Sequence, residues 1–340
     1  MKRLMIVAGL VVALGLVGAC SKEVPVDAVD AAEQAWTEFR AAYNEAETTE
    51  EKVPLIQAFM AEYPDTEFAG RLASAVTYYQ GNDMDDPAGA YGLLADTLAK
   101  NTDPEARYQI GTAMFPLAME LGEPMDLGSV AEELAATRAL DFNEMNDIAD
   151  LALEHEQWEI GAAYAEASLE KATPEAFLAD YPDDDYTAEV AAAKAERRQV
   201  MGLANFGWAL WNLEQPDEAM AAFERAAPIK SVNYVGAADT PLDYYHGRAL
   251  HASGDAAAAM ELLSASAIMG SDTDAMAALR ESYAAVKGGD EGFDEWTWSQ
   301  RESLAKTVDT FTLADYEGNT HDFADLADGK VTLLAFWFPT

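Results

Sequence analysis

This 340-residue chain has few of the thiol and imidazole side chains that act as nucleophiles or bind zinc. The single cysteine is Cys20, and the four histidines are His155, His246, His251 and His321. His246 and His251 are five residues apart, a spacing that suits neither one face of a helix nor the usual zinc patterns. We therefore predict no metal site and no bound cofactor, and thiol chemistry within these residues would depend on Cys20 alone.

The segment before Cys20 has the pattern of an export signal. Met1-Lys2-Arg3 is basic, and the residues from Leu4 to Ala19 are uncharged and mostly apolar. A basic start followed by an apolar run of this length and small residues is typical of a secretory signal peptide. The run is shorter than the roughly 18 to 20 apolar residues of a permanent membrane-spanning helix. Residues 1–19 are therefore predicted to be a signal peptide.

Four residues at the predicted cleavage point form an aliphatic-small-small-cysteine motif: Val17, Gly18, Ala19 and Cys20. The motif resembles the lipobox of bacterial lipoproteins, whose cysteine receives diacylglycerol. The resemblance implies a lipidated Cys20, with residues 20–26 as a tether; an ordinary cleavage site is the alternative. Ser21 stands where an inner-membrane lipoprotein would carry Asp, which favours the outer membrane. We expect a cell-envelope protein that is lipid-anchored to the membrane and faces the periplasm.

Lipidation of Cys20 would leave no disulfide and no cysteine nucleophile in residues 1–340. The chain carries 61 acidic and 21 basic residues, for a net charge of −40. Such a surface repels nucleic acid and gives no electrostatic attraction to anionic lipids. We therefore expect no nucleic-acid partner, and contact with the membrane through the acyl anchor.

Residues 27–305 are predicted to be helical. They are rich in Ala, Leu, Glu, Met and aromatic residues at helical spacing, and runs typical of strands are nearly absent. Seven groups of turn-forming residues interrupt the pattern: Tyr63-Pro64-Asp65, Gly81-Asn82, Asn101-Thr102-Asp103-Pro104, Gly122-Glu123-Pro124, Tyr181-Pro182-Asp183, Gln215-Pro216-Asp217 and Ser253-Gly254-Asp255. Paired helices separated by short turns indicate a helical-repeat solenoid.

The clearest repeat begins near Asn205. Gly207 lies in its first helix, and a small-aromatic-small stripe marks its second helix: Ala219, Phe223 and Ala226. Small residues let two helices approach closely, and the aromatic side chain fills the neighbouring groove. These four positions resemble the packing positions of the tetratricopeptide repeat (TPR). The resemblance implies that they are buried between helices.

A second unit repeats this spacing. Gly247 and Ala259 stand 40 residues after Gly207 and Ala219. The TPR period is about 34 residues, so about six residues are inserted, around positions 232–240. A weaker repeat has its second helix at residues 157–169. The resemblance implies a groove that takes a protein partner; an irregular helical bundle, the alternative, would bury the same residues.

The composition changes after Arg301. Phe311 to Leu313 starts an extended piece, and Asp315 to Asn319 has the chemistry of a turn between two short strands. The run from Val331 to Phe338 is continuously apolar and of strand length, which suits a buried central strand. Residues 306–340 are therefore predicted to begin a sheet.

Eleven residues of this segment fall in the order of a known motif set: Phe311, Leu313, Asp315, Gly318, Leu326, Gly329, Lys330, Phe336, Trp337, Pro339 and Thr340. The segment resembles the opening of thioredoxin-like redoxin domains, the group of thiol-disulfide oxidoreductases and alkyl-hydroperoxide reductases. The resemblance implies that the Cys-x-x-Cys site follows directly after Thr340, so we expect no catalytic residue in residues 1–340. A selenocysteine codon at that point would explain the end of the sequence; a nonsense mutation, a contig edge and a trimmed sequence are the alternatives.

The expected fold is mainly α, a TPR-like helical-repeat solenoid followed by a truncated α/β thioredoxin-like segment with a β-hairpin and the first central strand. Two functions are open. In the first, the complete product is a membrane-anchored thiol- or selenol-disulfide oxidoreductase or peroxidase-like redoxin, and residues 1–340 alone are inactive. In the second, the chain is a non-catalytic envelope lipoprotein whose repeats bind a partner protein.

Overall fold

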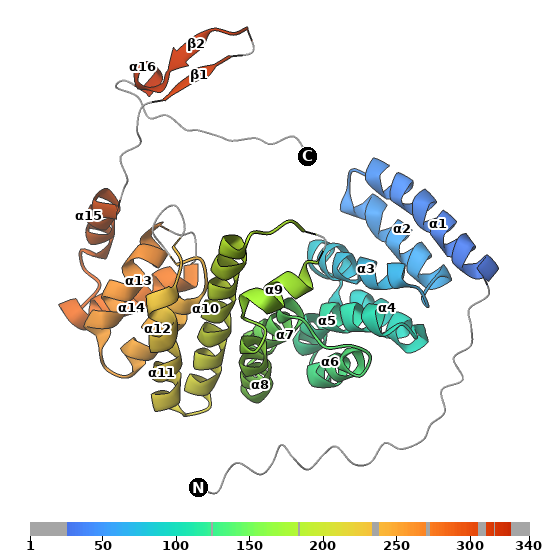
Figure 1. Cartoon of the computed structure of the whole chain (residues 1–340), viewed down its shortest axis with the longest axis horizontal. Coiled ribbons are helices and arrows are strands. Elements are labelled where there is room, and N and C mark those ends of the chain that lie inside the picture. Colours follow the sequence, from blue (N-terminus) through green and yellow to red (C-terminus); the bar gives the residue numbers. More distant parts are fainter. Residues whose placement is uncertain are drawn as a thin grey trace, which may run out of the picture. The chain divides into compact units, whose positions relative to one another are not determined.

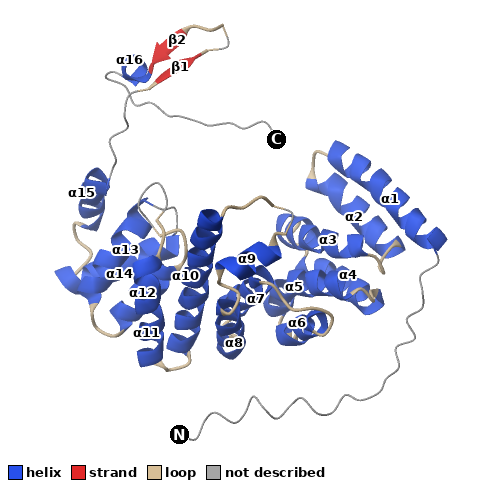
Figure 2. Cartoon of the chain, in the orientation of Figure 1, coloured by secondary structure: helices blue, strands red, loops and turns tan. Residues whose placement is uncertain are grey.

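A computed structural model describes residues 26–327, apart from 124, 183, 233–237, 270–272, 305–310 and 316. The described part is mainly helical and contains one small two-stranded antiparallel sheet (Figure 2). The prediction of a mainly helical chain is therefore confirmed. The chain divides into two compact units, Met1–Leu140 and Asp141–Thr340.

The described part of the first unit consists of seven helical segments (Figure 1): α1 (Val26–Glu45), α2 (Thr49–Glu62), α3 (Glu67–Ala75), η1 (Val76–Asp83), α4 (Pro87–Lys100), α5 (Pro104–Leu121) and α6 (Leu127–Ala135). Two of them start at a proline that follows an aspartate. Asp86 and Asp103 accept hydrogen bonds from the backbone N–H groups of Gly89 (3.0 Å) and Ala106 (2.8 Å). These aspartates satisfy N–H groups that a helix start leaves unpaired, and proline tolerates the first helical position.

Aromatic side chains from α1, α2 and α3 form much of the core of the first unit. The Trp36 ring stacks on Phe39 and Phe68, with centroid distances of 5.2 and 4.8 Å. Phe59 of α2 meets the edge of Trp36 at 5.5 Å. Beside these rings, Met60 is fully buried. Offset and edge-on ring pairs of this kind add to the stabilisation that burial itself provides.

The helices of the second unit are α7 (Phe142–Glu154), α8 (Trp158–Leu169), α9 (Pro174–Asp180), α10 (Ala188–Asn212), α11 (Pro216–Ala226), η2 (Ala227–Ile229), α12 (Leu242–Ala252), α13 (Ala256–Met269), α14 (Thr273–Lys287) and α15 (Phe293–Leu304). Several consecutive helices pack as pairs: α7 with α8, α10 with α11, and α12 with α13. The long helix α10 also packs against α8 and α12, so it joins neighbouring pairs.

The helices α7, α10, α12 and α14 each end in a recurring turn. Its closing residue has a left-handed backbone, with φ of 60° at Glu156, 59° at Glu214, 96° at Gly254 and 81° at Gly288. In each case the next N–H donates to the carbonyl five residues earlier, at 2.8, 3.0, 2.9 and 3.0 Å. This pattern satisfies carbonyl groups that the helix end leaves unpaired. Glycine adopts the conformation at no steric cost, whereas a glutamate does so with some strain.

The sheet is a hairpin near the end of the described residues. Strand β1 (Thr312–Ala314) pairs antiparallel with β2 (Thr320–Asp322), with Leu313 opposite His321. The short helix α16 (Phe323–Ala327) follows directly. The predicted turn at 315–319 is therefore confirmed. The predicted central strand at 331–338 lies outside the described residues. Within the predicted insertion, Val232 and Ala238 form an antiparallel bridge.

Candidate functional site

Several residues predicted from the sequence lie outside the described part of the chain. They are the signal and lipidation residues Val17, Gly18, Ala19 and Cys20, and the later redoxin-motif residues Gly329, Lys330, Phe336, Trp337, Pro339 and Thr340. The roles assigned to them stay predictions. For Leu326, the backbone belongs to α16.

Asp315 organises the turn of the hairpin. Its carboxylate oxygen Oδ1 accepts hydrogen bonds from the backbone N–H groups of Glu317 (2.9 Å) and Asn319 (2.8 Å). The other oxygen, Oδ2, lies 2.9 Å from Nε2 of His321. The hydrogen bond with His321, followed by those with Asn319, lowers the pKa of Asp315 to about 2. Gly318 supplies the positive φ of 85° that the turn requires.

The two other described motif residues of the hairpin differ in their surroundings. The ring of Phe311 stacks on Phe323, with a centroid distance of 4.8 Å. Leu313 of β1 is 58% exposed. The hairpin therefore brings Phe311, Asp315 and Gly318 into one local structure through backbone pairing and turn contacts.

The TPR-like positions lie inside the contacts between paired helices. A Cβ atom built on Gly207 of α10 would stand only 2.6 Å from Cε1 of Phe223 on α11. A Cβ on Gly247 of α12 would stand 2.5 Å from Cγ of Leu263 on α13. Both glycines are buried, and the stripe residues of the second helices are fully buried: Ala219, Phe223, Ala226 and Ala259. The helices can therefore approach this closely because glycine has no side chain at positions 207 and 247.

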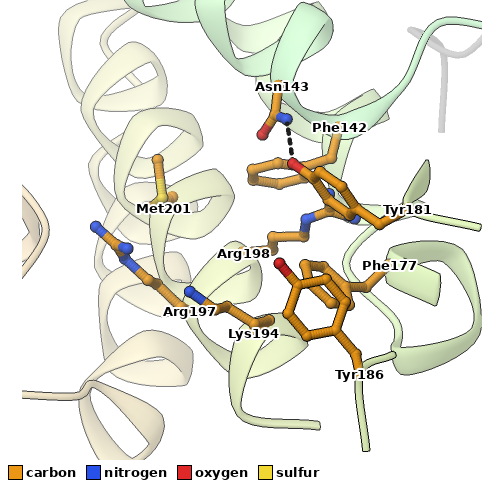
Figure 3. A pocket seen from close by; sticks show the side chains of 9 residues that line it. All are labelled: Phe142, Asn143, Phe177, Tyr181, Tyr186, Lys194, Arg197, Arg198 and Met201. Atoms are coloured by element: carbon orange, nitrogen blue, oxygen red, sulfur yellow. Dashed lines mark hydrogen bonds between the residues drawn. The ribbon is translucent and has the colours of Figure 1, made fainter. Parts of the chain in front are cut away.

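The most distinctive hollow of the second unit is one that the sequence did not predict. It lies between α7, α9 and α10, has a volume of about 270 Å³, and is called the arginine–aromatic pocket here (Figure 3). Its lining consists of four rings, three cations and two further side chains: Phe142, Phe177, Tyr181, Tyr186, Lys194, Arg197, Arg198, Asn143 and Met201. None of these described lining residues is acidic.

Arg198 is the central side chain of the arginine–aromatic pocket, and only 6% of it is exposed. Its guanidinium lies 4.8 Å from the centre of the Phe142 ring and 4.9 Å from that of Phe177. Nη1 is 2.7 Å from Oδ2 of Asp180, and it donates a longer bond of 3.4 Å to the carbonyl of Lys171. Nη2 is buried and has no hydrogen-bond partner among the described residues. Arg198 of α10 therefore contacts both α7 and α9, and its Nη2 group remains without an acceptor among the described residues.

The other two cations of the pocket are exposed and stand on the same face of α10. Arg197 and Arg198 follow Lys194 by three and four residues, the spacings that place side chains next to each other on one face of a helix. Nε of Arg197 lies 3.4 Å from Oδ2 of Asp239. In this ion pair the arginine side chain is exposed and the aspartate side chain is half-buried. In the described ranges, Lys194 forms no ion pair. Lys194 and Arg197 thus place two cations on the exposed side of the pocket, and Asp239 pairs with one of them.

Three rings on α9 and the loop after it complete the wall. Phe177 lies 5.0 Å from Tyr181 and 5.1 Å from Tyr186 between ring centroids. Asn143 of α7 donates from Nδ2 to the hydroxyl of Tyr181 at 3.0 Å, as the dashed line in Figure 3 shows. This bond and the ring contacts hold the loop over α10.

A polar network connects α7 and α10, and its residues follow the pocket residues along these two helices. Nδ2 of Asn205 donates to Oδ1 of Asp150 at 2.6 Å, and Nδ2 of Asn146 donates to Oδ2 at 2.7 Å. Burial raises the pKa of Asp150 to about 6, helped by the negative charges of Asp147 and Glu154 and opposed by these hydrogen bonds. Burial also raises the pKa of Asp147. The carboxyl group of Asp150 therefore titrates within a nearly neutral pH range.

A second, more open hollow of about 390 Å³ lies between α12 and α13 and includes Asp243 and His246. Asp243 is buried and already paired, because Nζ of Lys230 lies 2.8 Å away and the Ser266 hydroxyl donates to it at 2.9 Å. The His246 ring stacks on Phe223, and burial lowers the pKa of His246. These contacts pair Asp243 within the fold, whereas the buried Nδ1 of His246 has no hydrogen-bond partner among the described residues.

Neither a metal centre nor a membrane span is found in the described ranges. No group of three or more histidine, cysteine or carboxylate side chains there could hold a metal ion. Of the helices described, none is long and apolar enough to cross a bilayer.

Known proteins do not supply a family for the chain. No protein-family model matches it, and no curated protein matches its sequence.

Proposed function

We propose that the chain is a lipid-anchored envelope protein in which a helical-repeat scaffold carries the start of a thioredoxin-like redox domain. The observation that carries the redox part is the hairpin of residues 312–322. Its turn depends on Asp315 and Gly318, the two residues that match the Asp-x-x-Gly element of redoxin openings. In this proposal the reactive thiol or selenol follows Thr340, and residues 1–340 supply the anchor, the scaffold and the first strands.

The repeat part of the proposal is supported by the recurrence of two local features. The left-handed turn residues Glu214, Gly254 and Gly288 are separated by 40 and 34 residues, and the TPR period is about 34. In addition, Gly207 meets Phe223 and Gly247 meets Leu263 at equivalent places in consecutive helix pairs. A solenoid in which each pair packs on the next would present one helix of each pair to a partner protein.

The anchor is tested by removing the lipidation site. Cys20→Ala should abolish labelling of the protein by a clickable fatty acid and leave unprocessed precursor, because Cys20 is the lipobox cysteine and the only cysteine of residues 1–340. Ser21→Ala is the matched control and should label like the wild type. A Cys20→Ala protein that still labels and fractionates with membranes would contradict the assignment.

The redox function is tested on the native protein isolated from membranes. It should reduce a disulfide substrate such as insulin with dithiothreitol as reductant, and alkylation should abolish the activity. The protein ending at Thr340 should be inactive, because its only thiol is acylated. Turnover by this shorter protein, or none by the native protein, would refute the redox proposal.

A second candidate function is a non-catalytic binding module of the envelope. The arginine–aromatic pocket favours it, because three cations and four rings converge on a hollow that makes no contact with the hairpin residues. Under this alternative the native protein has no disulfide-reductase activity, yet it retains ligand binding at α10.

A further inference from the structure

We propose that the arginine–aromatic pocket binds a carboxylate that is attached to a flat apolar group, such as the carboxyl end of a peptide with an aromatic last residue. The redox proposal assigns this pocket no role, so the inference goes beyond it and does not depend on it. Three independent features of the pocket support the proposal: its charge, its unused donor and its aromatic wall.

The charge of the lining is the first feature. The chain has 21 basic residues against 61 acidic ones, yet three of the nine described lining residues are cations and none of those nine is an anion. Asp180 balances Arg198, and Asp239 partly balances Arg197 at 3.4 Å. Lys194 has no ion-pair partner in the part that the structure describes. Lys194 is therefore the cation of the pocket that is available to pair with an anionic ligand.

The unused donor of Arg198 is the second feature. The side chain is about nine-tenths buried, and Nη2 has no hydrogen-bond partner among the described residues. A buried N–H group without an acceptor is costly, and most such groups in proteins are satisfied. A carboxylate oxygen at the pocket floor would supply this acceptor, with the second oxygen facing Lys194. Nη2 is covered by protein atoms, so the side chains over it have to shift when the ligand enters.

The aromatic wall is the third feature. The ring centres of Phe142, Phe177 and Tyr181 lie 4.8 to 5.9 Å from the guanidinium, and Tyr186 extends the wall by packing against Phe177 (Figure 3). Their faces offer flat apolar area that a small inorganic anion would not use, whereas an aromatic group beside the carboxylate would bury area against them. Tyr186 is 38% exposed, so part of this apolar area is still open to a ligand.

The same contacts also have a structural role, which decides the choice of variants. Arg198 ties α10 to α7 and α9, so its removal would disturb the fold as well as any binding. Lys194 and Arg197 are exposed and can be changed with the helix intact. The double variant Lys194→Gln/Arg197→Gln removes two charges of the pocket. Arg248→Gln, an exposed cation of α12 that does not line the pocket, is the matched control.

Binding is measured by saturation-transfer NMR on the mature lipidated protein in nanodiscs, with empty nanodiscs as background. The probes are N-acetylphenylalanine, its uncharged amide and inorganic phosphate. We expect N-acetylphenylalanine to bind, the amide to bind at least tenfold more weakly, and phosphate to compete poorly. The double variant should weaken N-acetylphenylalanine binding tenfold or more, and Arg248→Gln should leave it unchanged.

Three results would overturn the proposal. Failure of N-acetylphenylalanine to bind would refute the proposed site. Equal binding of the amide would show that the carboxylate is not recognised. Tight binding of phosphate alone would indicate a site for small anions without use of the aromatic wall. Circular dichroism of each variant shows whether the helices are intact. The Tyr186→Ala variant gives a second test, because it should weaken the binding of N-acetylphenylalanine and leave that of phosphate unchanged.

Discussion

Replacement of Gly207 by alanine is the sharpest test of how the helix pairs pack. In an open helix position, Gly→Ala stabilises a protein by about 0.5 to 1 kcal/mol, because alanine has the better helix propensity. At Gly207 the added Cβ would lie 2.6, 2.9 and 3.0 Å from three ring atoms of Phe223. That ring is fully buried, so it cannot move aside freely. Overpacking of this kind costs about 1 to 3 kcal/mol.

Gly92 provides the matched control. It lies in the interior of α4, is exposed, and a Cβ built on it meets nothing within 4 Å. Gly92→Ala should therefore raise the unfolding free energy, and Gly207→Ala should lower it. We expect the two effects to differ by about 2 kcal/mol, measured by urea denaturation followed by circular dichroism.

A double-mutant cycle assigns the cost to the contact with the ring. Phe223→Leu removes the aromatic atoms that the new Cβ would meet, so Gly207→Ala should cost about 1 kcal/mol less in this background than in the wild type. An increase in stability on Gly207→Ala, equal to that of Gly92→Ala, would refute the close approach of α10 and α11 at this point.

Two further predictions concern the second unit. Asp150 has a folded pKa raised to about 6 against about 3.9 for an unfolded chain, so the fold binds the proton more tightly and stability falls as pH rises through this window. Asp150→Asn should therefore gain about 1 kcal/mol relative to the wild type between pH 5 and pH 7.5 in urea denaturation, and a pH-independent difference would contradict the burial of this carboxyl group. Ala219→Glu places a charge at a fully buried position and should cost several kcal/mol, whereas Ala221→Glu on the exposed side of α11 should change stability by at most about 0.5 kcal/mol. Similar melting temperatures for the two variants would count against the assigned burial of α11.

Most helix ends could be predicted from local chemistry. Proline at the first position and a preceding turn residue mark the starts of α5 and α11, and the structure starts these helices at Pro104 and Pro216. Glycine marks the end of α12, where Gly254 takes the left-handed conformation. These positions are predictable because the backbone restricts which residues fit there.

Other boundaries gave no such signal. Glu156 adopts the same left-handed turn as Gly254, although glutamate rarely does, so its role depends on tertiary packing. The repeat alignment placed the first helix near Asn205, whereas α10 begins at Ala188 and has 25 residues. The extra turns carry Lys194, Arg197 and Arg198, and nothing in the helical pattern marks them as an addition.

The arginine–aromatic pocket could not be predicted from the sequence. Phe142 and Arg198 are far apart along the chain and meet only because α7, α9 and α10 pack together. A weak signal was present, since aromatic residues flank the acidic loop at Tyr181 and Tyr186 just before a basic stretch of α10. The pairing of these rings with the guanidinium depends on where α9 folds back, and local propensity does not determine that.

The central claim is that a lipid-anchored scaffold carries a thioredoxin-like redox domain. Intact-mass spectrometry of the native protein tests it most directly, after extraction from membranes, reduction and alkylation. The account predicts a mature species that starts at a diacylated Cys20, extends past Thr340, and takes up alkyl groups at a thiol or selenol beyond that residue. A species that retains Met1, lacks the lipid, or ends at Thr340 without an alkylated group would contradict it.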